Sequence, residues 1–264
     1  MKKTAVLVIA SLAKPVYVHY VTGYWKRAAE YLGQCNLPID VFLLFEHHCD
    51  LDSLQFPAEC LIQEPYTDYE ILCDSRFHNE ISPGLLSKTV FALEQLEDHY
   101  DVFFRTNLSS FLKLERFNEY VQNEQNIEYS GPFVWTEALR DNLIQNQKVG
   151  PGRSIQSIDE LSGFCGNSFA SGCGFFLNRG EVNRLVSMKN HLRYDLPDDV
   201  AIGLALPGCK VLPDFCETIS PNTSTVEIIY SALRSKNCHI RLEHFPASTA
   251  IEAWKVLESA EIWR

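Results

Sequence analysis

The stretch that decides the fold is Tyr100 to Phe111, YDVFFRTNLSSF, where an apolar run ends abruptly in small polar residues. Val102 to Phe104 has the character of a β-strand buried on both faces, as in the middle of a parallel sheet. The polar run from Thr106 to Ser110 would then lie at the carboxyl end of that strand, where open α/β sheets bind their ligands. Asn and Ser are also common in turns and at helix N-caps, so a capped turn without a ligand is the alternative.

The composition is that of a chain able to bury a large core. It has 264 residues, 46% of them hydrophobic, with no linker or internal repeat, so we expect a single domain over residues 1–264. A formal net charge of −11 leaves no broad basic surface to attract nucleic acid or an anionic membrane. Nine cysteines without a C-x-x-C pair indicate reduced thiols in a cytoplasmic protein.

The N-terminal segment admits two interpretations. Met1-Lys2-Lys3 followed by an apolar run resembles a short signal peptide. We prefer a first β-strand over Thr4–Ala10, because the run passes straight into a helical pattern and lacks a small-x-small cleavage site. No other run is long enough to cross a bilayer, so the sequence predicts no transmembrane segment and a soluble cytoplasmic protein of bacterial or viral style.

Hydrophobic periodicity predicts alternating strands and helices along the rest of the chain. Helices are expected over Val16–Leu32, Pro83–Glu97, Lys113–Gln122, Gly180–Asn190, Pro197–Leu206 and Thr249–Trp263. Strands are expected over Ile39–Phe45, Cys60–Gln63, Ile127–Val134, Phe169–Leu177, Cys209–Leu212 and Cys238–Leu242, while Thr225–Ser235 fits either state. Pro65–Ser82 and Glu137–Glu160 are expected to be loops. The alternation predicts an α/β fold with a mixed, mostly parallel sheet flanked by helices.

Two short patterns suggest positions where a ligand could approach. Ser171, Gly172 and Gly174 interrupt a strand-like run, and glycine there permits close approach of a ligand or simply tight packing. Asp198 and Asp199 follow Pro197 at a helix start, where the helix dipole favours carboxylate anions and where Asp is also an ordinary capping residue.

Taken in order, four segments resemble the β1,3-galactosyltransferase and Fringe-like group of glycosyltransferases. That family has a helix beginning Leu-x-Lys-Thr, a strand ending in Asp-x-Asp, a Tyr-x-Ser-Gly-x-Gly-type strand and a Glu-Asp-Val helix start. The matching segments here are Leu86–Thr89, Phe104–Ser109, Phe169–Gly174 and Asp198–Gly203. The resemblance spans residues 80 to 206 and implies a GT-A-like (Rossmann-like) fold.

The resemblance implies inverting transfer of a sugar from a nucleotide diphosphate sugar, with UDP-sugars favoured, to a hydroxyl of a glycan or glycoconjugate. Such chemistry needs a carboxylate base to take the hydroxyl proton. Asp199 matches the family's base, and Asp198 would hold polar ligand groups or orient that base. Ser171, Gly172 and Trp135 match the acceptor and sugar side, although Trp135 could equally pack inside the protein.

The chain departs from the family at the Asp-x-Asp positions, which are Asn107 and Ser109 here. An amide and a hydroxyl are weak ligands for Mn²⁺ or Mg²⁺, so we expect no required metal and no tightly held protein-bound ion. The donor diphosphate would then meet Ser11, Lys14, Lys88, Arg105, Thr106, Asn107, Ser109 and Arg241. One alternative is an ion held mostly by the nucleotide and by His244. Another is a noncatalytic protein of the same fold that binds nucleotide sugars or glycans.

Overall fold

The computed structural model describes residues 1–12, 14–45, 50–54, 56–63, 85–125, 127–132, 134–135, 168–192, 198–219, 222, 224–242 and 247–259. The predicted loops Pro65–Ser82 and Glu137–Glu160, and the candidate metal ligand His244, lie outside these residues.

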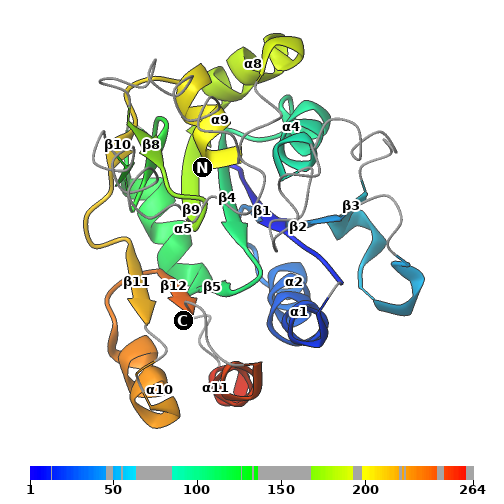
Figure 1. Cartoon of the computed structure of the whole chain (residues 1–264), viewed down its shortest axis with the longest axis vertical. Helices are drawn as coiled ribbons and strands as arrows, with labels where there is room; N and C mark the ends of the chain where they lie inside the picture. Colours follow the sequence, from blue (N-terminus) through cyan, green and yellow to red (C-terminus); the bar gives the residue numbers. More distant parts are fainter. Residues whose placement is uncertain are drawn as a thin grey trace, which may run out of the picture.

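A seven-stranded β-sheet forms the centre of the molecule (Figure 1). Neighbouring strands follow the order β10 (Lys210–Val211), β6 (Ser130–Gly131), β9 (Gly174–Asn178), β4 (Val102–Asn107), β1 (Thr4–Ile9), β2 (Ile39–Phe45) and β3 (Leu61–Gln63). Strand β9 is antiparallel to both of its neighbours, and the other described pairs in this sheet are parallel. The predicted mixed, mostly parallel sheet is therefore confirmed.

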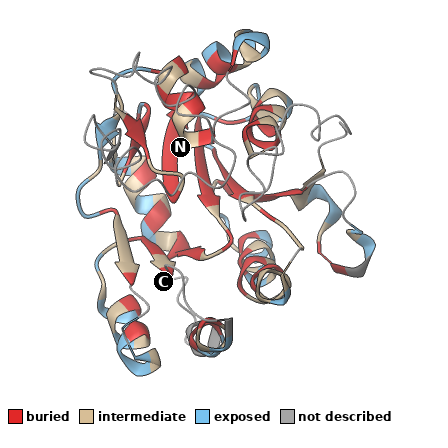
Figure 2. Ribbon diagram, in the orientation of Figure 1, coloured by how far each residue is buried: buried red, intermediate tan, exposed pale blue. Residues whose placement is uncertain are grey.

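Side chains of the sheet alternate between two apolar cores, one on each face. On β1, Val6 and Val8 face the first core, whereas Ala5 and Leu7 face the second. This is the period of two that a β-strand imposes on its side chains. Because both faces are covered, the central strands are mostly apolar, and Figure 2 shows them as the most buried part of the molecule.

Helices cover both faces of the sheet. The first core is covered by α1 (Pro15–Tyr20), the π-helical turn η1 (Val21–Trp25), α2 (Lys26–Gln34), α5 (Leu114–Asn123), α10 (Thr225–Arg234) and α11 (Ala247–Ser259). The second core is covered by α4 (Leu85–Leu96), α8 (Arg179–Ser187) and α9 (Asp198–Ala205). Short 3₁₀ turns occur at η2 (Asp52–Leu54), η3 (Ala58–Cys60) and η6 (Lys189–His191). The predicted helices are all present, with ends shifted by a few residues.

The segment Thr225–Ser235, which fitted either state, is helical. Its helix α10 begins with a capping box, in which the Ser224 side chain accepts from the Glu227 amide and the Glu227 carboxylate accepts from the Ser224 amide. These reciprocal bonds satisfy donors that a helix start otherwise leaves unpaired. The residues that distinguish helix from strand in this segment are therefore those of the N-terminal cap, Ser224 and Glu227.

Two small sheets lie beside the central one. One has the order β11 (Cys216–Ile219), β12 (His239–Leu242) and β5 (Ser110–Leu112), and the other pairs β7 (Val134–Trp135) with β8 (Phe169–Ala170). The strand predicted over Ile127–Val134 is two short strands, β6 and β7, in different sheets. The run predicted over Phe169–Leu177 is likewise broken, at residues 171–173. Strands β5 and β11 were not predicted.

The long helix after β1 is continuous but irregular. The predicted helix Val16–Leu32 contains the five-residue π-helical turn η1, in which Tyr24 and Trp25 are fully buried. Tyr24 Oη donates to the Leu112 carbonyl at 2.6 Å and accepts from the Leu112 amide at 2.7 Å. Trp25 Nε1 donates to the Leu108 carbonyl at 3.2 Å. The turn therefore fastens this helix to the backbone that follows β4.

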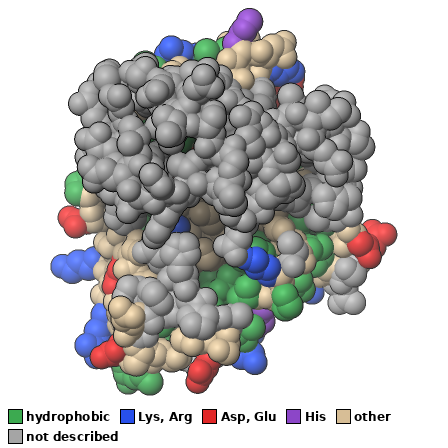
Figure 3. All heavy atoms as spheres, viewed as in Figure 1, with side chains coloured by type: hydrophobic (Ala, Val, Ile, Leu, Met, Phe, Trp, Pro, Cys, Tyr) green, Lys and Arg blue, Asp and Glu red, His purple; other side chains and the backbone are tan. Residues whose placement is uncertain are grey.

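The surface in Figure 3 carries Lys and Arg side chains interspersed with Asp and Glu, where its atoms are not grey. Among the described residues, no helix combines the length and the apolar character needed to span a bilayer.

Candidate active site

The candidate site lies where the direction of chain winding in the central sheet reverses. Strands β2 and β4 flank β1 on opposite sides, and open α/β sheets bind ligands beyond the carboxyl ends of strands at such a position. The register pairs Ile9 with Asn107, the last residues of β1 and β4. Asn107 therefore lies at the end of β4, and Ser11 lies two residues beyond the end of the neighbouring strand β1. Lys88 reaches the same edge from α4, where its Nζ donates to the Ala10 carbonyl at 3.2 Å. Three predicted donor contacts thus share one edge of the sheet.

The other predicted donor contacts are placed as follows. Lys14 precedes α1 as its N-cap, with Nζ 5.6 Å from the centroid of the Tyr17 ring. Ser109 is partly buried in the turn after β4, and its carbonyl accepts from the Leu242 amide at 3.0 Å. Thr106 is fully buried, and its hydroxyl donates to the Cys173 carbonyl at 2.9 Å. We therefore assign Thr106 to supporting the turn at 171–173, whereas the sequence predicted a ligand contact.

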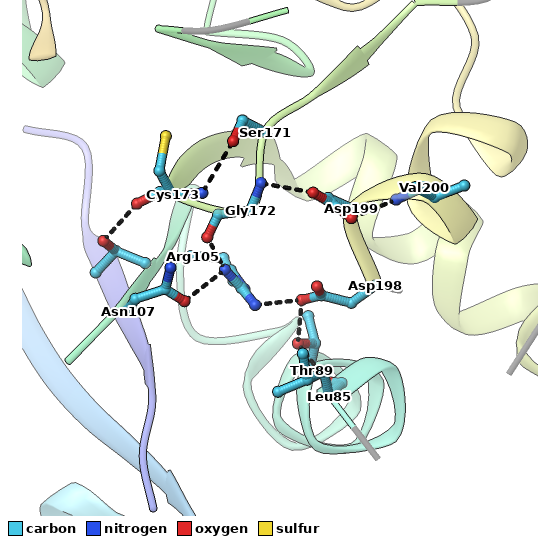
Figure 4. Close-up of polar contacts among 11 residues, drawn as sticks. Leu85, Thr89, Arg105, Asn107, Ser171, Gly172, Cys173, Asp198, Asp199 and Val200 are labelled. Atoms are coloured by element: carbon cyan, nitrogen blue, oxygen red, sulfur yellow. Dashed lines mark hydrogen bonds and ion pairs between the residues drawn. The ribbon is translucent and has the colours of Figure 1, made fainter. Parts of the chain in front are cut away.

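Arg105 is the centre of a buried polar network (Figure 4). Its Nη2 lies 2.7 Å from Asp198 Oδ2, and both side chains are 3% exposed. Its Nη1 donates to Asn107 Oδ1 at 3.0 Å and to the Gly172 carbonyl. The guanidinium plane also lies 5.7 Å from the centroid of the Phe175 ring. The sequence predicted Arg105 as a cation facing the donor, but its charge is offset by Asp198 inside the protein.

Thr89 also belongs to this network, although the sequence-based site did not include it. Its Oγ1 lies 3.4 Å from Asp198 Oδ2 and 2.8 Å from the Leu85 carbonyl. The signal was available, because Thr89 stands in the Leu-Ser-Lys-Thr segment that carried the resemblance. Its contact with Asp198 joins α4 to the start of α9.

Asp199 is oriented by two backbone amides at the start of α9. Its Oδ2 accepts from the Gly172 amide at 2.8 Å, and its Oδ1 accepts from the Val200 amide at 2.9 Å. A carboxylate oxygen can accept more than one hydrogen bond, so each oxygen keeps the capacity to accept from a ligand. Asp199 is also less buried than Asp198.

The two adjacent carboxylates therefore have different electrostatic environments. Burial, followed by the nearby Asp198 charge, raises the pKa of Asp199 to about 6. The amides of Gly172 and Val200, together with Arg105, act in the opposite direction but do not outweigh these two effects. The sequence predicted that the helix start would stabilise the Asp199 anion, and burial reverses the direction of that shift. Asp199 is nonetheless mostly ionised at neutral pH.

Gly172 sits in contact with both charged groups. A Cβ atom at this position would lie 3.2 Å from Asp199 Oδ2 and 3.3 Å from Arg105 Nη1. Ser171 is next to it, and Ser171 Oγ accepts from the Cys173 amide at 3.4 Å. Of the two alternatives that the sequence left open for this glycine, the structure shows tight packing against protein groups, and close approach of a ligand stays a prediction. Trp135 pairs with Phe169 through the backbone of β7 and β8, and its side chain is outside the described residues.

The donor set at the end of β4 does not fit a divalent cation. Asn107 Oδ1 already accepts from the Arg105 guanidinium, which would repel an ion placed beside it. The nearest carboxylate in the network, Asp198, is paired with the same guanidinium. Among the described residues, no three or more His, Cys, Asp or Glu side chains are grouped so as to hold a metal. Hard cations such as Mg²⁺ require charged or freely available oxygens, which these residues do not offer.

Comparison with known proteins finds similarity in structure but not in sequence. No family model matches the chain, and no curated protein sequence matches it. A glycosyltransferase involved in glycosylation of the major capsid of PBCV-1 aligns with a TM-score of 0.46 at 10% identity, over 96% of this chain and 98% of that one. Mouse xyloside xylosyltransferase 1 in its apo form gives 0.41 at 11% identity, over 92% and 98%.

The galactosyltransferase LgtC, in complex with donor and acceptor sugar analogs, gives a TM-score of 0.46 at 10% identity, over 97% of this chain and 95% of that one. Because these TM-scores are below 0.5 and the identities are 10–11%, the proposed function rests on the site residues and not on these similarities.

Proposed function

We propose that this chain is an inverting glycosyltransferase. It would move a sugar from a nucleotide diphosphate sugar, with UDP-sugars favoured, to a hydroxyl of a glycan or glycoconjugate, without a tightly held protein-bound metal. The observation that supports this most directly is that the adjacent carboxylates of Asp198 and Asp199 have different electrostatic environments. Active sites give neighbouring carboxylates different roles by placing them in different environments. Here one carboxylate is paired with a buried guanidinium, and the other has a raised pKa.

Asp199 is the proposed general base. A base works best when its pKa lies near the working pH, so that it is ionised but still takes a proton readily. A pKa of about 6 meets that condition at neutral pH. The Gly172 and Val200 amides fix the carboxylate, so an acceptor hydroxyl would meet it in one orientation. Removing the hydroxyl proton would allow the acceptor oxygen to attack the anomeric carbon from the face opposite the diphosphate.

Asp198 is a positioning residue in this proposal. Its carboxylate is buried and joins Arg105, on β4, to the first turn of α9. Because Arg105 also donates to the Gly172 carbonyl, the same guanidinium holds both the helix start and the turn that contacts Asp199. The base therefore depends on Arg105 and Asp198 for its location.

The order of motifs that resembles the β1,3-galactosyltransferase and Fringe-like group supports the choice of donor and the inverting outcome. Ser11, Lys14, Lys88, Asn107 and Ser109 remain the proposed donor contacts, because they lie at or next to the edge where β1 and β4 end. Ser171, Gly172 and Trp135 remain the proposed contacts on the acceptor and sugar side.

The test is Asp199→Asn compared with Asp98→Asn, which makes the same chemical change on an exposed residue. Transfer from a panel of nucleotide diphosphate sugars would be measured with EDTA and with Mn²⁺, alongside donor affinity by calorimetry. Asp199→Asn should reduce turnover by at least about 10²-fold, the low end for loss of a general base, with donor affinity changed by less than about twofold. Asp98→Asn should behave as wild type.

Three results would contradict the proposal. Retained turnover in Asp199→Asn would remove Asp199 from the role of base. Binding of a nucleotide sugar without transfer or donor hydrolysis by the wild type would favour the noncatalytic alternative. A wild-type chain that binds no nucleotide sugar under any metal condition would not be a glycosyltransferase of this kind.

A further inference from the structure

A row of polar side chains crosses the three-stranded sheet next to the candidate site. The register pairs Thr218 of β11 with Arg241 of β12, and Arg241 with Ser110 of β5. Side chains at paired positions of neighbouring strands point to the same face of a sheet. The three residues, which we call the Arg241 row, therefore lie side by side although they are far apart in the sequence.

This face of the small sheet is turned towards the end of β4. His239 precedes Arg241 by two residues and so shares its face, since strand side chains alternate. The His239 Nε2 lies 3.4 Å from Thr106 Oγ1, and a Cβ atom on Gly174 would lie 2.9 Å from His239 Cε1. The positive charge of Arg241, after burial, contributes to lowering the pKa of His239 to about 3. Arg241 thus lies near the end of β4, where the candidate site begins.

The Arg241 row begins directly after the polar turn at the end of β4. The Leu242 amide donates to the Ser109 carbonyl at 3.0 Å, which places Arg241 beside the positions where the family has its metal carboxylates. Cys216, two residues before Thr218, has a thiol whose pKa is raised above its usual range by burial and by the nearby Cys173. Since Cys173 belongs to the turn that contains Gly172, the row and that turn approach the same region.

One polar side-chain atom of each residue in the row has no hydrogen-bond partner among the described residues. Within the described residues, Ser110 Oγ, Thr218 Oγ1 and Arg241 Nε are buried and make no hydrogen bond to nitrogen or oxygen. Thr218 has only the weakly bonding Cys216 thiol beside its hydroxyl. Ser110 is 0% exposed, whereas Arg241 is partly exposed. Arg105, in contrast, has Asp198 as its counter-ion.

Unpartnered buried polar groups are costly, and a cation without an anion is costlier still. The chain has 34 Asp and Glu against 23 Lys and Arg, so a shortage of acidic residues does not explain why Arg241 has no ion pair within the part of the chain that the structure describes. The guanidinium can only donate, and each of the two flanking hydroxyls can rotate to donate as well, so the row can present several donors and one positive charge to the same ligand. Such a set matches the oxygens of a phosphate group, which accept several charge-assisted hydrogen bonds.

We propose that Arg241, Ser110 and Thr218 form an oxyanion subsite that binds a phosphate group of the nucleotide diphosphate donor. This inference rests on the proposed function for the identity of the ligand. It assigns the charge that offsets the diphosphate to Arg241, since the end of β4 has no carboxylates for a metal and the Arg105 charge is offset by Asp198. As the bond from the anomeric carbon to the diphosphate oxygen breaks, the electron pair stays on that oxygen, and the subsite stabilises the added negative charge.

The test measures binding of inorganic pyrophosphate and of UDP to the full chain by calorimetry, in EDTA. Arg241→Gln is compared with Arg234→Gln, which makes the same change on an exposed arginine of α10. Wild type and Arg234→Gln should bind both ligands equally well, whereas Arg241→Gln should weaken both at least tenfold. Arg241→Lys, which keeps the charge but loses the planar fork, should bind more weakly than wild type and more tightly than Arg241→Gln.

Several results would overturn the subsite. The first is that wild type binds no pyrophosphate, and the second is that Arg241→Gln binds both ligands as tightly as wild type. The third is that Arg241→Gln binds pyrophosphate more weakly but UDP as tightly as wild type, which would indicate a site for a free anion only. A ligand-free Arg241→Gln chain that melts below wild type would show a structural role instead. Asp199→Asn should still bind pyrophosphate as wild type does. A chain that binds pyrophosphate through Arg241 but transfers no sugar would keep the subsite and lose the glycosyltransferase.

Discussion

Arg105→Met is the most informative perturbation of the structure, because one guanidinium connects β4, the turn at 171–173 and α9. Methionine can fill much of the same space but carries no charge. The substitution leaves Asp198, 3% exposed, without the cation that lies 2.7 Å away in the wild type. Removing one partner of a buried ion pair costs about 3–5 kcal/mol, since the remaining charge stays desolvated. Loss of the bond to the Gly172 carbonyl acts in the same direction.

The expected loss is large compared with total stability, which is about 5–15 kcal/mol for a folded protein. At about 2–4 °C per kcal/mol for a domain of this size class, Arg105→Met should lower the melting temperature by about 6–20 °C. Thermal and urea unfolding, monitored by circular dichroism, would measure it. Arg179→Met is the matched control, because Arg179 pairs with Asp101 at 3.1 Å with side chains 44% and 47% exposed. An exposed pair of this kind contributes at most about 1 kcal/mol.

A double-mutant cycle separates the ion pair from other effects of the substitution. Asp198→Asn alone leaves the Arg105 cation buried without its counter-ion, so it should also destabilise. Arg105→Met with Asp198→Asn removes both charges and should cost clearly less than the sum of the two single changes. The reasoning would be refuted if Arg105→Met lost no more stability than Arg179→Met, or if the two losses were simply additive.

Two further stability predictions follow from contacts at the start and middle of α9. Relative to wild type, Asp199→Asn should gain stability as the pH rises from about 4 to 7, because the folded-state pKa of about 6 lies above the usual value and ionised Asp199 therefore costs stability. Asparagine has one acceptor oxygen and loses one of the two backbone-amide bonds at every pH, so the pH dependence is the quantity to measure. A stability difference between the two chains that is the same at pH 4 and pH 7, measured by urea unfolding, would contradict this. Gly203→Ala should destabilise by about 1–3 kcal/mol or more, since its Cβ would lie 2.2 Å from Phe169 Cβ. Gly33→Ala, with open space at the Cβ, should be neutral or stabilising, and equal melting temperatures for the two variants would count against the packing argument.

Much of the fold follows from local patterns that the sequence displays openly. Thr4–Ile9 and Ile39–Phe45 are mostly apolar because helices cover both faces of the sheet. The helices show a helical periodicity because one side of each packs on the sheet. Strands β5 and β11, of three and four residues, were not predicted, although β3 and β12, which are equally short, were. Their pairing depends on distant partners, which no local pattern contains.

The sequence identified most residues of the candidate site, but it did not show which of them contact one another or how deeply they are buried. Asp199, Asp198, Gly172 and Arg105 stood in the segments that carried the resemblance, and the structure brings them into one network. That Arg105 faces Asp198 rather than a ligand depends on how β4, β9 and α9 pack together. Burial of Asp199 likewise arises only in the folded chain, which is why the direction of its pKa shift was wrong in the prediction. The Arg241 row required the strand register.

The π-helical turn affects how freely residues 107 and 109, at the end of β4, can be substituted. Tyr24 and Trp25 hold the segment after β4 through the main-chain atoms of Leu108 and Leu112, not through side chains. Any residue at those two points offers the same carbonyl, so the brace makes no demand on the identity of Asn107 or Ser109. The course of the segment after β4 is therefore held independently of those two side chains, and the identity of residue 107 matters instead through its hydrogen bond with Arg105.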